Sequence, residues 1–287
     1  MKVLVLGASG MLGSAIFREL FACPRTDLLG TVSSSQRKTY FPPSMHDAIH
    51  DGIAVEALEN CSRLIERFQP DVLINCIGIV KQRSEGQNLE KSSVINTFAP
   101  RFLAHTCATR GIRFIHFSTD CVFDGVAGNY RETDPCSPTD IYGITKMCGE
   151  IVDGGALTLR TSIVGPELYR RLGLFEWFKA QPEAVQGYKN VHFSGVPTAY
   201  LAKIVKQILY DFPDLAGLYH VASERISKYE LLEIFSDVCA SEIAIHPSET
   251  PVLDRSLNAD KFSDATGIFP EPWHELSSYL RPEVFAE

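Results

Sequence analysis

The chain has 287 residues, of which 45% are hydrophobic, and its formal net charge is −8. This size allows one large domain or two modest ones with a buried core, and the acidic balance argues against a nucleic-acid partner. The sequence contains no apolar stretch long enough to cross a membrane, and no signal peptide is expected because a strand is predicted from Lys2. Eight cysteines without the spacing of metal ligands predict free thiols, no metal site and a cytoplasmic protein.

The N-terminus predicts a strand, a glycine-rich turn and a helix. Residues 2–6 are an apolar run typical of a buried parallel strand, and residues 14–21 have the pattern of a helix. The turn has the spacing Gly-x-x-Gly-x-x-Gly, which allows the backbone to approach an anion at the helix N-terminus. A plain connecting turn is the alternative, but the order of elements favours dinucleotide binding. The expected cofactor contacts in this turn are Gly7, Ser9, Gly10, Met11, Leu12 and Gly13.

The second strand is expected to end near residues 30–33. A carboxylate at this point would bind the ribose 2′-hydroxyl of NAD, but the chain continues with the segment SSSQRK at residues 33–38. Hydroxyls and two cations suit a 2′-phosphate. Ser33, Ser34 and Arg37 are therefore predicted cofactor ligands, and NADP(H) is expected to be preferred over NAD(H). A solvated basic loop is the competing interpretation.

The most informative cluster combines Ser118-Thr119-Asp120 with Tyr142 and Lys146. If residues 142–146 are helical, Tyr142 and Lys146 lie one turn apart on the same face. An ammonium beside a phenol favours the phenolate, so we expect Lys146 to lower the pKa of Tyr142 towards neutrality. Such a tyrosine exchanges a proton with a carbonyl or alcohol oxygen, which a Thr or Ser hydroxyl can hold. Taken alone, Tyr-x-x-x-Lys also fits a solvated lysine beside a half-buried tyrosine.

Strands and helices alternate through the first half of the chain. Apolar runs predict buried strands at residues 72–77, 111–117 and 155–160, and a long helix is predicted at residues 94–110. This alternation predicts an α/β fold with a Rossmann-like, doubly wound parallel sheet. The segment 118–120 then lies at the carboxyl end of a strand, where ligands bind in such sheets.

The composition of the sequence changes after residue 160, where prolines and aromatic residues become more frequent. A helix at 198–210 and a strand at 217–221 are expected to return to the sheet, and Ser227 with Glu230 forms a capping box that opens a further helix. The predicted division is a dinucleotide-binding domain at 1–160, with returns near 197–222, and a smaller, mixed C-terminal substrate domain at 161–287, interdigitated at their boundary.

Six segments carry a resemblance to a known family: GASGMLG at 7–13, INTFAPRFLA at 95–104, STDCVFDG at 118–125, YGITK at 142–146, LRTSIVG at 159–165 and YHVASERISKYELL at 219–232. Together they resemble the extended short-chain dehydrogenase/reductase superfamily. Within it, the chain is most similar to the dTDP-4-dehydrorhamnose reductase family of nucleotide-sugar reductases. The resemblance covers nearly the whole chain and is specific to the superfamily, and it is much less specific to one substrate.

The resemblance implies a role for each matching residue. Thr119 matches the family's catalytic Thr or Ser, Tyr142 its acid, and Lys146 the residue that lowers the Tyr pKa and holds the nicotinamide ribose. The implied reaction is hydride transfer from NADP(H) to the 4-keto carbon of a nucleotide-linked deoxysugar, with Tyr142 protonating the developing alkoxide. Further implied cofactor contacts are Cys76, Ile77, Gly78 and Asn96, and implied substrate contacts are Asp120, Cys121, Val122 and Ile163.

Two departures from the family leave the sugar open, because Cys121 and Ile163 stand where the family often has Tyr and Trp. A thiol at this position disfavours the sugar 4,6-dehydratases, which carry Glu there. Epimerase-reductases of the GDP-fucose synthase type carry Cys as an acid/base with a distant His, a pair that Cys121 and His192 resemble. Packing of Cys121 as a small pocket filler is the preferred interpretation. The methionine adenosyltransferase regulatory subunit, an interaction protein, resembles the same family, and a homodimer is compatible with the sequence.

Overall fold

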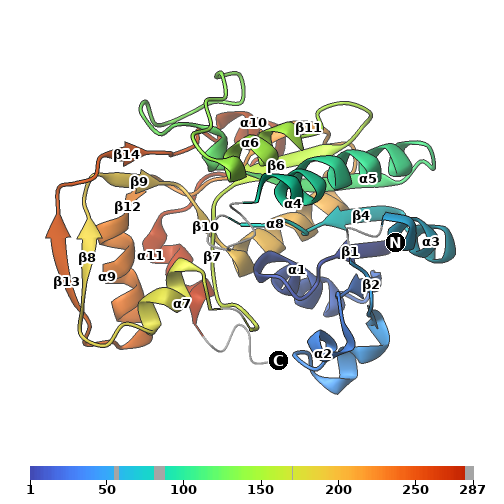
Figure 1. Cartoon of the computed structure of the whole chain (residues 1–287), viewed down its shortest axis with the longest axis horizontal. Coiled ribbons are helices and arrows are strands. Elements are labelled where there is room, and N and C mark those ends of the chain that lie inside the picture. The colour runs from blue at the N-terminus through green and yellow to red at the C-terminus, as the bar shows by residue number, and fades with distance from the viewer. Residues whose placement is uncertain (55–57, 81–87, 170, 282–287) are drawn as a thin grey trace.

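The computed structural model describes residues 1–54, 58–80, 88–169 and 171–281, and a seven-stranded sheet lies at its centre (Figure 1). The strands follow the order β11-β6-β5-β4-β1-β2-β3, and every neighbouring pair is parallel. The predicted α/β fold with a doubly wound parallel sheet is therefore confirmed. Its strands are β1 (Lys2–Leu6), β2 (Asp27–Thr31), β3 (Ile49–His50), β4 (Val72–Asn75), β5 (Arg113–Thr119), β6 (Leu157–Thr161) and β11 (Gly217–His220).

Helices cover both faces of this sheet, which explains why its strands are continuous apolar runs. Along β1, Val3 and Val5 join one core with α1 (Met11–Phe21) and α8 (Thr198–Asp211). The intervening Leu4 and Leu6 join the other core with α3 (Leu58–Phe68) and α5 (Ala99–Ala108). Successive side chains of a strand point to opposite faces, so one short run supplies both cores. Short helical segments complete this half: α2 (Ser35–Lys38), η1 (Pro43–Ala48), α4 (Leu89–Ser93), η3 (Val94–Phe98), η4 (Asp120–Val122) and α6 (Ile141–Cys148).

The long helix predicted at 94–110 is present, but it begins earlier and changes form along its length. It starts with α4, passes through the π-helical turn η3 and continues as α5. Pro100 stands in the first turn of α5 and has no N–H to donate to the carbonyl four residues before it. This missing bond accounts for the π turn just before the proline.

Three other boundaries differ from the sequence-based expectations near the site. Helix α1 begins at Met11, inside the glycine-rich turn, instead of at residue 14. Strand β5 extends to Thr119, so Ser118 and Thr119 are its last residues. Strand β4 stops at Asn75, whose side-chain oxygen accepts a hydrogen bond from the backbone N–H of Ile77 and turns the chain away from the sheet.

The later part of the chain forms a smaller mixed region beside the sheet (Figure 1). The expected returns occur, because α8 packs in the same core as α1 and β11 pairs with β6. The capping box of Ser227 and Glu230 opens α9 as predicted. The domain division itself stays a prediction. The elements of this region are β7 (Ile163–Val164), α7 (Leu174–Lys179), β8 (Ala184–Tyr188), β9 (Val191–Phe193), β10 (Val196–Pro197), β12 (Ile226–Ser227), α9 (Lys228–Cys239), β13 (Ala244–Ser248), β14 (Leu253–Asp254), α10 (Asp260–Thr266), α11 (Trp273–Leu276) and η5 (Ser277–Leu280).

Among the residues that the structure describes, none of the helices has both the length and the apolar character needed to cross a membrane.

Candidate active site

A cleft of about 520 Å³ opens at the carboxyl ends of the central strands. This volume lies within the range of small-molecule sites, and this edge of a parallel sheet is where ligands bind. The smaller region closes the other side of the cleft with residues 191–193, Lys228, Leu253 and Arg255. The sheet contributes residues 9–12 after β1, 75–80 around the end of β4, 117–121 of β5 and the turn after it, and 161–162 at the end of β6, which are followed by 163–164 of β7.

The glycine-rich turn gives the cleft an anion-binding end. Gly7 has a φ of +81°, which favours glycine, and a Cβ on Gly13 would overlap the carbonyl oxygen of Gly7. The turn and the start of α1 therefore pack closely only with these glycines. Gly10 is the N-cap of α1 and has no side chain to occupy the helix N-terminus, and the first turn carries no acidic residue. The first-turn amides suit the pyrophosphate of a dinucleotide.

The predicted cofactor contacts divide into lining residues and supporting residues. Asn96 supports the site, because its buried side chain accepts a hydrogen bond from Ile79 N at 2.9 Å and donates one to Ile79 O at 3.1 Å. Gly7 and Gly13 likewise act through the shape of the turn. The predicted contacts that line the cleft are Ser9, Gly10, Met11, Leu12, Cys76, Ile77 and Gly78.

Ser33, Ser34 and Arg37 do not belong to the lining of the cleft. Ser34 is the N-cap of α2, and the Arg37 guanidinium lies 4.8 Å from the ring centroid of Tyr169, which does line the cleft. Lys38 donates a hydrogen bond to the carbonyl of Ile49. The structure thus places Arg37 at the border of the cleft through its contact with Tyr169, and the proposed 2′-phosphate contact stays a prediction.

Thr119, Tyr142 and Lys146 meet in the cleft as the sequence predicts. Helix α6 starts at Ile141, after Asp140 accepts a hydrogen bond from Gly143 N at 2.7 Å. Tyr142 and Lys146 lie one turn apart on this helix, and Thr119 is the last residue of β5. A Cβ on Gly143 would overlap the carbonyl oxygen of Cys121, so this glycine allows α6 to approach the end of β5 closely.

The expectation that Lys146 lowers the pKa of Tyr142 is wrong in this structure. Burial raises the pKa of Tyr142 above its ordinary value, and the charge of Cys121 adds to this, while a hydrogen bond with Thr119 opposes it. Lys146 instead donates a hydrogen bond to the carbonyl of Phe117 at 2.6 Å, and its Nζ lies 3.5 Å from Nε2 of His116. Burial lowers the pKa of Lys146 to about 8. The phenol therefore keeps its proton at neutral pH.

Three of the four predicted substrate contacts, Asp120, Cys121 and Ile163, line the cleft. Asp120 accepts a hydrogen bond from the hydroxyl of Thr119 at 3.1 Å. The prediction that Val122 contacts the substrate is wrong. Its side chain is fully buried in a small core with Phe123, because η4 turns it away from the cleft.

Cys121 and His192, the pair behind the epimerase alternative, both line the cleft. Burial lowers the pKa of His192, so its imidazole is neutral at neutral pH. Nη1 of Arg255 lies 3.5 Å from Sγ of Cys121, and the Arg255 Nε donates to the carbonyl of Phe123. Sequence reasoning missed Arg255, because it stands 134 residues after Cys121 in a stretch without a motif.

The described residues contain no cluster of three or more His, Cys, Asp or Glu side chains that could hold a metal ion. Separately, the lining of the cleft combines the glycine-rich start of α1 with the phenol of Tyr142 and the hydroxyl of Thr119.

The family model of the RmlD substrate binding domain matches residues 1–273. The chain belongs to the RmlD family. A curated relative is the probable low-salt glycan biosynthesis reductase Agl14 of Haloferax volcanii, 34% identical over 169 residues, which cover 57% of this chain and only 54% of that protein. Another is the methionine adenosyltransferase 2 subunit beta of Xenopus laevis, 28% identical over 291 residues, with 95% of this chain and 79% of that protein covered.

Solved structures of other proteins share the fold of this RmlD family member. The dTDP-4-dehydrorhamnose reductase of Bacillus anthracis in complex with NADP has a TM-score of 0.80 and 18% identity, covering 100% of this chain and 99% of that one. The Bordetella bronchiseptica enzyme WbmG in complex with NAD has a TM-score of 0.77 and 17% identity, covering 97% and 92%. The Haloferax volcanii protein and the Bacillus anthracis protein are both named as reductases.

Proposed function

We propose that this RmlD family member is an NADP-dependent reductase of a 4-keto-deoxysugar linked to a nucleotide. The observation that carries the proposal is the meeting of Thr119, Tyr142 and Lys146 in one cleft with the glycine-rich N-terminus of α1. In this proposal a dinucleotide would lie at the glycine-rich end of the cleft, and the sugar would lie beside Asp120 and Cys121, which line the same cleft. The reductase names among relatives and neighbours support the same class of reaction.

The residues of the cleft divide the chemistry among them. A bound nicotinamide would supply the hydride. Tyr142, whose raised pKa keeps its proton in place, would donate that proton to the oxygen at C4 as negative charge develops there. The Thr119 hydroxyl would hold the same oxygen, and Lys146 would hold the nicotinamide ribose. The backbone amides at the start of α1 would hold the pyrophosphate.

A panel of nucleotide-linked 4-keto-sugars tests the proposal. Each compound is added with NADPH, and both the thermal midpoint of the protein and the loss of NADPH absorbance are recorded. We expect one nucleotide class to raise the midpoint and to be reduced. Binding of NADPH without turnover of any member of the panel would contradict the proposal.

We predict tighter binding of NADP(H) than of NAD(H), because Ser33, Ser34 and Arg37 follow β2 without a carboxylate. Removing one charge-assisted contact to the 2′-phosphate costs about 1.5–3 kcal/mol. Arg37→Ala should therefore weaken NADPH binding by this amount and leave NADH binding unchanged in calorimetric titrations. Arg25→Ala is the matched control, since Arg25 also stacks on a tyrosine but outside the cleft. Tighter NADH binding by the natural chain would refute the prediction.

Cys121 allows a direct test of the epimerase alternative. An epimerase-reductase removes a proton beside the keto group, so its product formed in D2O carries deuterium at C3 or C5. We propose a simple reductase and expect no enzyme-dependent deuterium in the ring, together with only a modest loss of activity in Cys121→Ser. A reaction without enzyme corrects for spontaneous enolisation. Ring deuterium that disappears in Cys121→Ser would establish the alternative.

The likeness to the methionine adenosyltransferase subunit favours a second candidate, an NADP-binding regulatory subunit. Cofactor binding does not separate the two candidates, whereas turnover of a keto-sugar does. A cytoplasmic location and a homodimer stay predictions from the sequence.

A further inference from the structure

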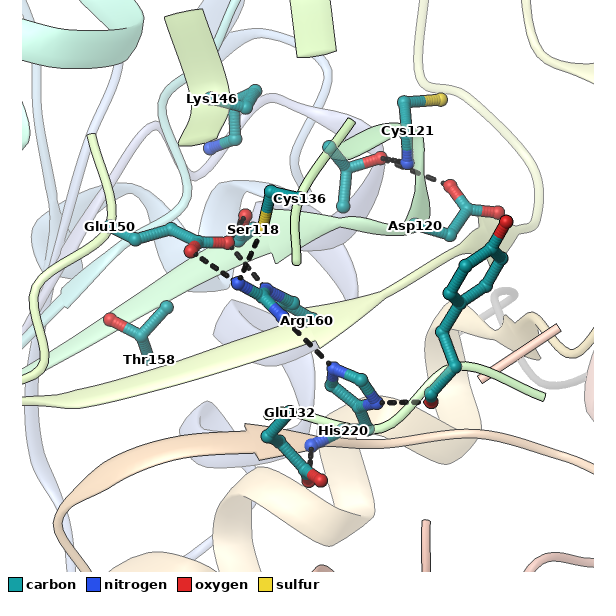
Figure 2. Close-up of polar contacts among 12 residues, drawn as sticks. Ser118, Asp120, Cys121, Glu132, Cys136, Lys146, Glu150, Thr158, Arg160 and His220 are labelled. Carbon is teal, nitrogen blue, oxygen red and sulfur yellow. Dashed lines mark hydrogen bonds and ion pairs between the residues drawn. The ribbon is translucent and has the colours of Figure 1, made fainter. Parts of the chain in front are cut away.

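Arg160 and Glu150 form a buried ion pair (Figure 2). Arg160 of β6 donates from Nε to Oε1 of Glu150 at 2.7 Å and from Nη2 to Oε2 at 2.8 Å. The two side chains are only 4% and 9% exposed. Glu150 follows the end of α6 by two residues, so the pair ties this helix to the sheet.

The same carboxylate also holds the strand that carries Thr119. The hydroxyl of Ser118 donates to Oε1 of Glu150 at 2.6 Å (Figure 2). Ser118 is aligned with Arg160 across the β5–β6 pair, and Thr119 is the next residue along β5. Glu150 is therefore the point at which the helix of Tyr142 and Lys146, the end of β5 and the end of β6 are joined.

The rest of the Arg160 guanidinium is fixed from the other side. Its Nη1 lies 3.3 Å from Nε2 of His220, its Nη2 donates to Sγ of Cys136, and it lies over the ring of Phe123. Burial lowers the pKa of His220 to about 3, so the imidazole is neutral and its Nε2 can accept the hydrogen bond. With these partners, Arg160 holds Glu150 in a single position.

The charge of Glu150 also acts on the buried amine of Lys146, which lies four residues earlier in the chain. Burial lowers the pKa of Lys146 to about 8, and the charges of Glu150 and Cys76 oppose this lowering. The neighbouring imidazole of His116 stays neutral, because burial holds its pKa well below the ordinary value. Burial likewise raises the pKa of Cys76, which disfavours its thiolate at neutral pH. Glu150 is then the group that favours the charged form of Lys146.

We propose that Glu150 is a positioning residue for the active site: it fixes Thr119 against the Tyr142–Lys146 helix and provides the counter-charge of Lys146. The proposal deepens the proposed function and rests on it for the role of the three side chains. Its two parts can be tested separately. A change at Ser118 affects the position of Thr119, whereas loss of the Glu150 charge affects the pKa of Lys146.

The first test measures Lys146 without any substrate. The full chain is labelled with ¹³C and ¹⁵N at lysine, the Lys146 signal is assigned with Lys146→Met, and its titration is followed by NMR. We expect a midpoint near pH 8 in the natural chain and a lower midpoint in Glu150→Gln. Glu66→Gln is the matched control, because Glu66 forms an exposed pair with Arg110, and it should leave the midpoint unchanged. An unchanged or higher midpoint in Glu150→Gln would overturn the counter-charge role.

Folding of the variant is checked first, because Glu150→Gln leaves a buried guanidinium without its carboxylate. If it does not fold, the double variant Glu150→Gln/Arg160→Met removes the carboxylate without this defect. A downward shift of the Lys146 midpoint is still expected, but a smaller one, because the positive charge of Arg160 is removed as well. The NMR experiment needs no turnover, so its outcome is independent of whether a keto-sugar is reduced.

The second test uses Ser118→Ala, which keeps the ion pair and removes only its bond to β5. The probe is the member of the nucleotide-linked 4-keto-sugar panel that the natural chain reduces fastest. With it, we expect kcat to fall about tenfold through misplacement of Thr119, while the KM for NADPH and the Lys146 midpoint stay unchanged. Ser118→Thr, which keeps the hydroxyl, should restore kcat. Full kcat in Ser118→Ala would overturn the positioning role, whereas absence of turnover of every panel member by the natural chain would count against the proposed function.

Discussion

Tyr142→Phe is expected to lower the rate of keto-sugar reduction about a hundred- to ten-thousand-fold, the usual effect of losing a general acid. The hydroxyl is lost from the cleft, but the ring remains and continues to pack on α6. The measurement is the single-turnover rate of NADPH oxidation with a confirmed substrate. NADPH affinity, measured by fluorescence titration in the same samples, should stay within about threefold of the natural value.

The physical basis of this prediction is the protonation state of Tyr142. Because burial raises the pKa of the phenol, the reductive direction starts with the proton in the right place and needs no activation by Lys146. Tyr219→Phe is the matched control, since Tyr219 lies outside the lining of the cleft and its ring packs beneath Lys261. Near-full turnover in Tyr142→Phe would exclude Tyr142 as the acid.

The sequence predicted those parts of the site that short segments encode. The turn at 7–13 combines a strand, glycines and a helix within a few residues, so its geometry is local. Tyr142 and Lys146 are set one turn apart by the helix alone. Thr119 joins them because the carboxyl ends of parallel strands share one edge of the sheet. These features depend on backbone geometry, which the pattern of residues specifies well.

The sequence did not predict which way a side chain points in the folded protein. The spacing of Tyr142 and Lys146 suggested a direct electrostatic coupling, but the Lys146 amine bonds to the carbonyl of Phe117 on β5. Val122 continues the motif of Asp120 and Cys121, yet η4 rotates it into a core. Both errors arise because burial and the choice of partner depend on contacts with other parts of the chain.

Hydrogen-bond partners that are distant in the chain could not be predicted from the sequence, for a related reason. Arg160 and His220 are 60 residues apart, and neither belongs to a motif that predicts their contact. They meet because β6 and β11 are neighbours in the sheet, in register at these two residues. The pairing of β11 with β6 follows from the return of the chain to the sheet, which the sequence indicated, but the register that aligns Arg160 with His220 needed the structure.

Arg160→Met is expected to lower the free energy of unfolding by about 3–5 kcal/mol, because it leaves the Glu150 carboxylate buried without its partner. Urea denaturation of the full chain measures the change. Arg110→Met is the matched control: its pair with Glu66 is exposed, so the loss should stay below about 1 kcal/mol.

The double variant Glu150→Gln/Arg160→Met distinguishes an unpaired charge from lost packing. If the cost of Arg160→Met is mainly the stranded carboxylate, the double variant should regain a large part of the stability, since apolar or neutral replacements of a buried pair are often nearly neutral. If packing against Phe123 and His220 dominates, the double variant should be at least as unstable as Arg160→Met. The first outcome is expected. The guanidinium and the carboxylate are both over nine-tenths buried, and each can stay charged there because the other neutralises it.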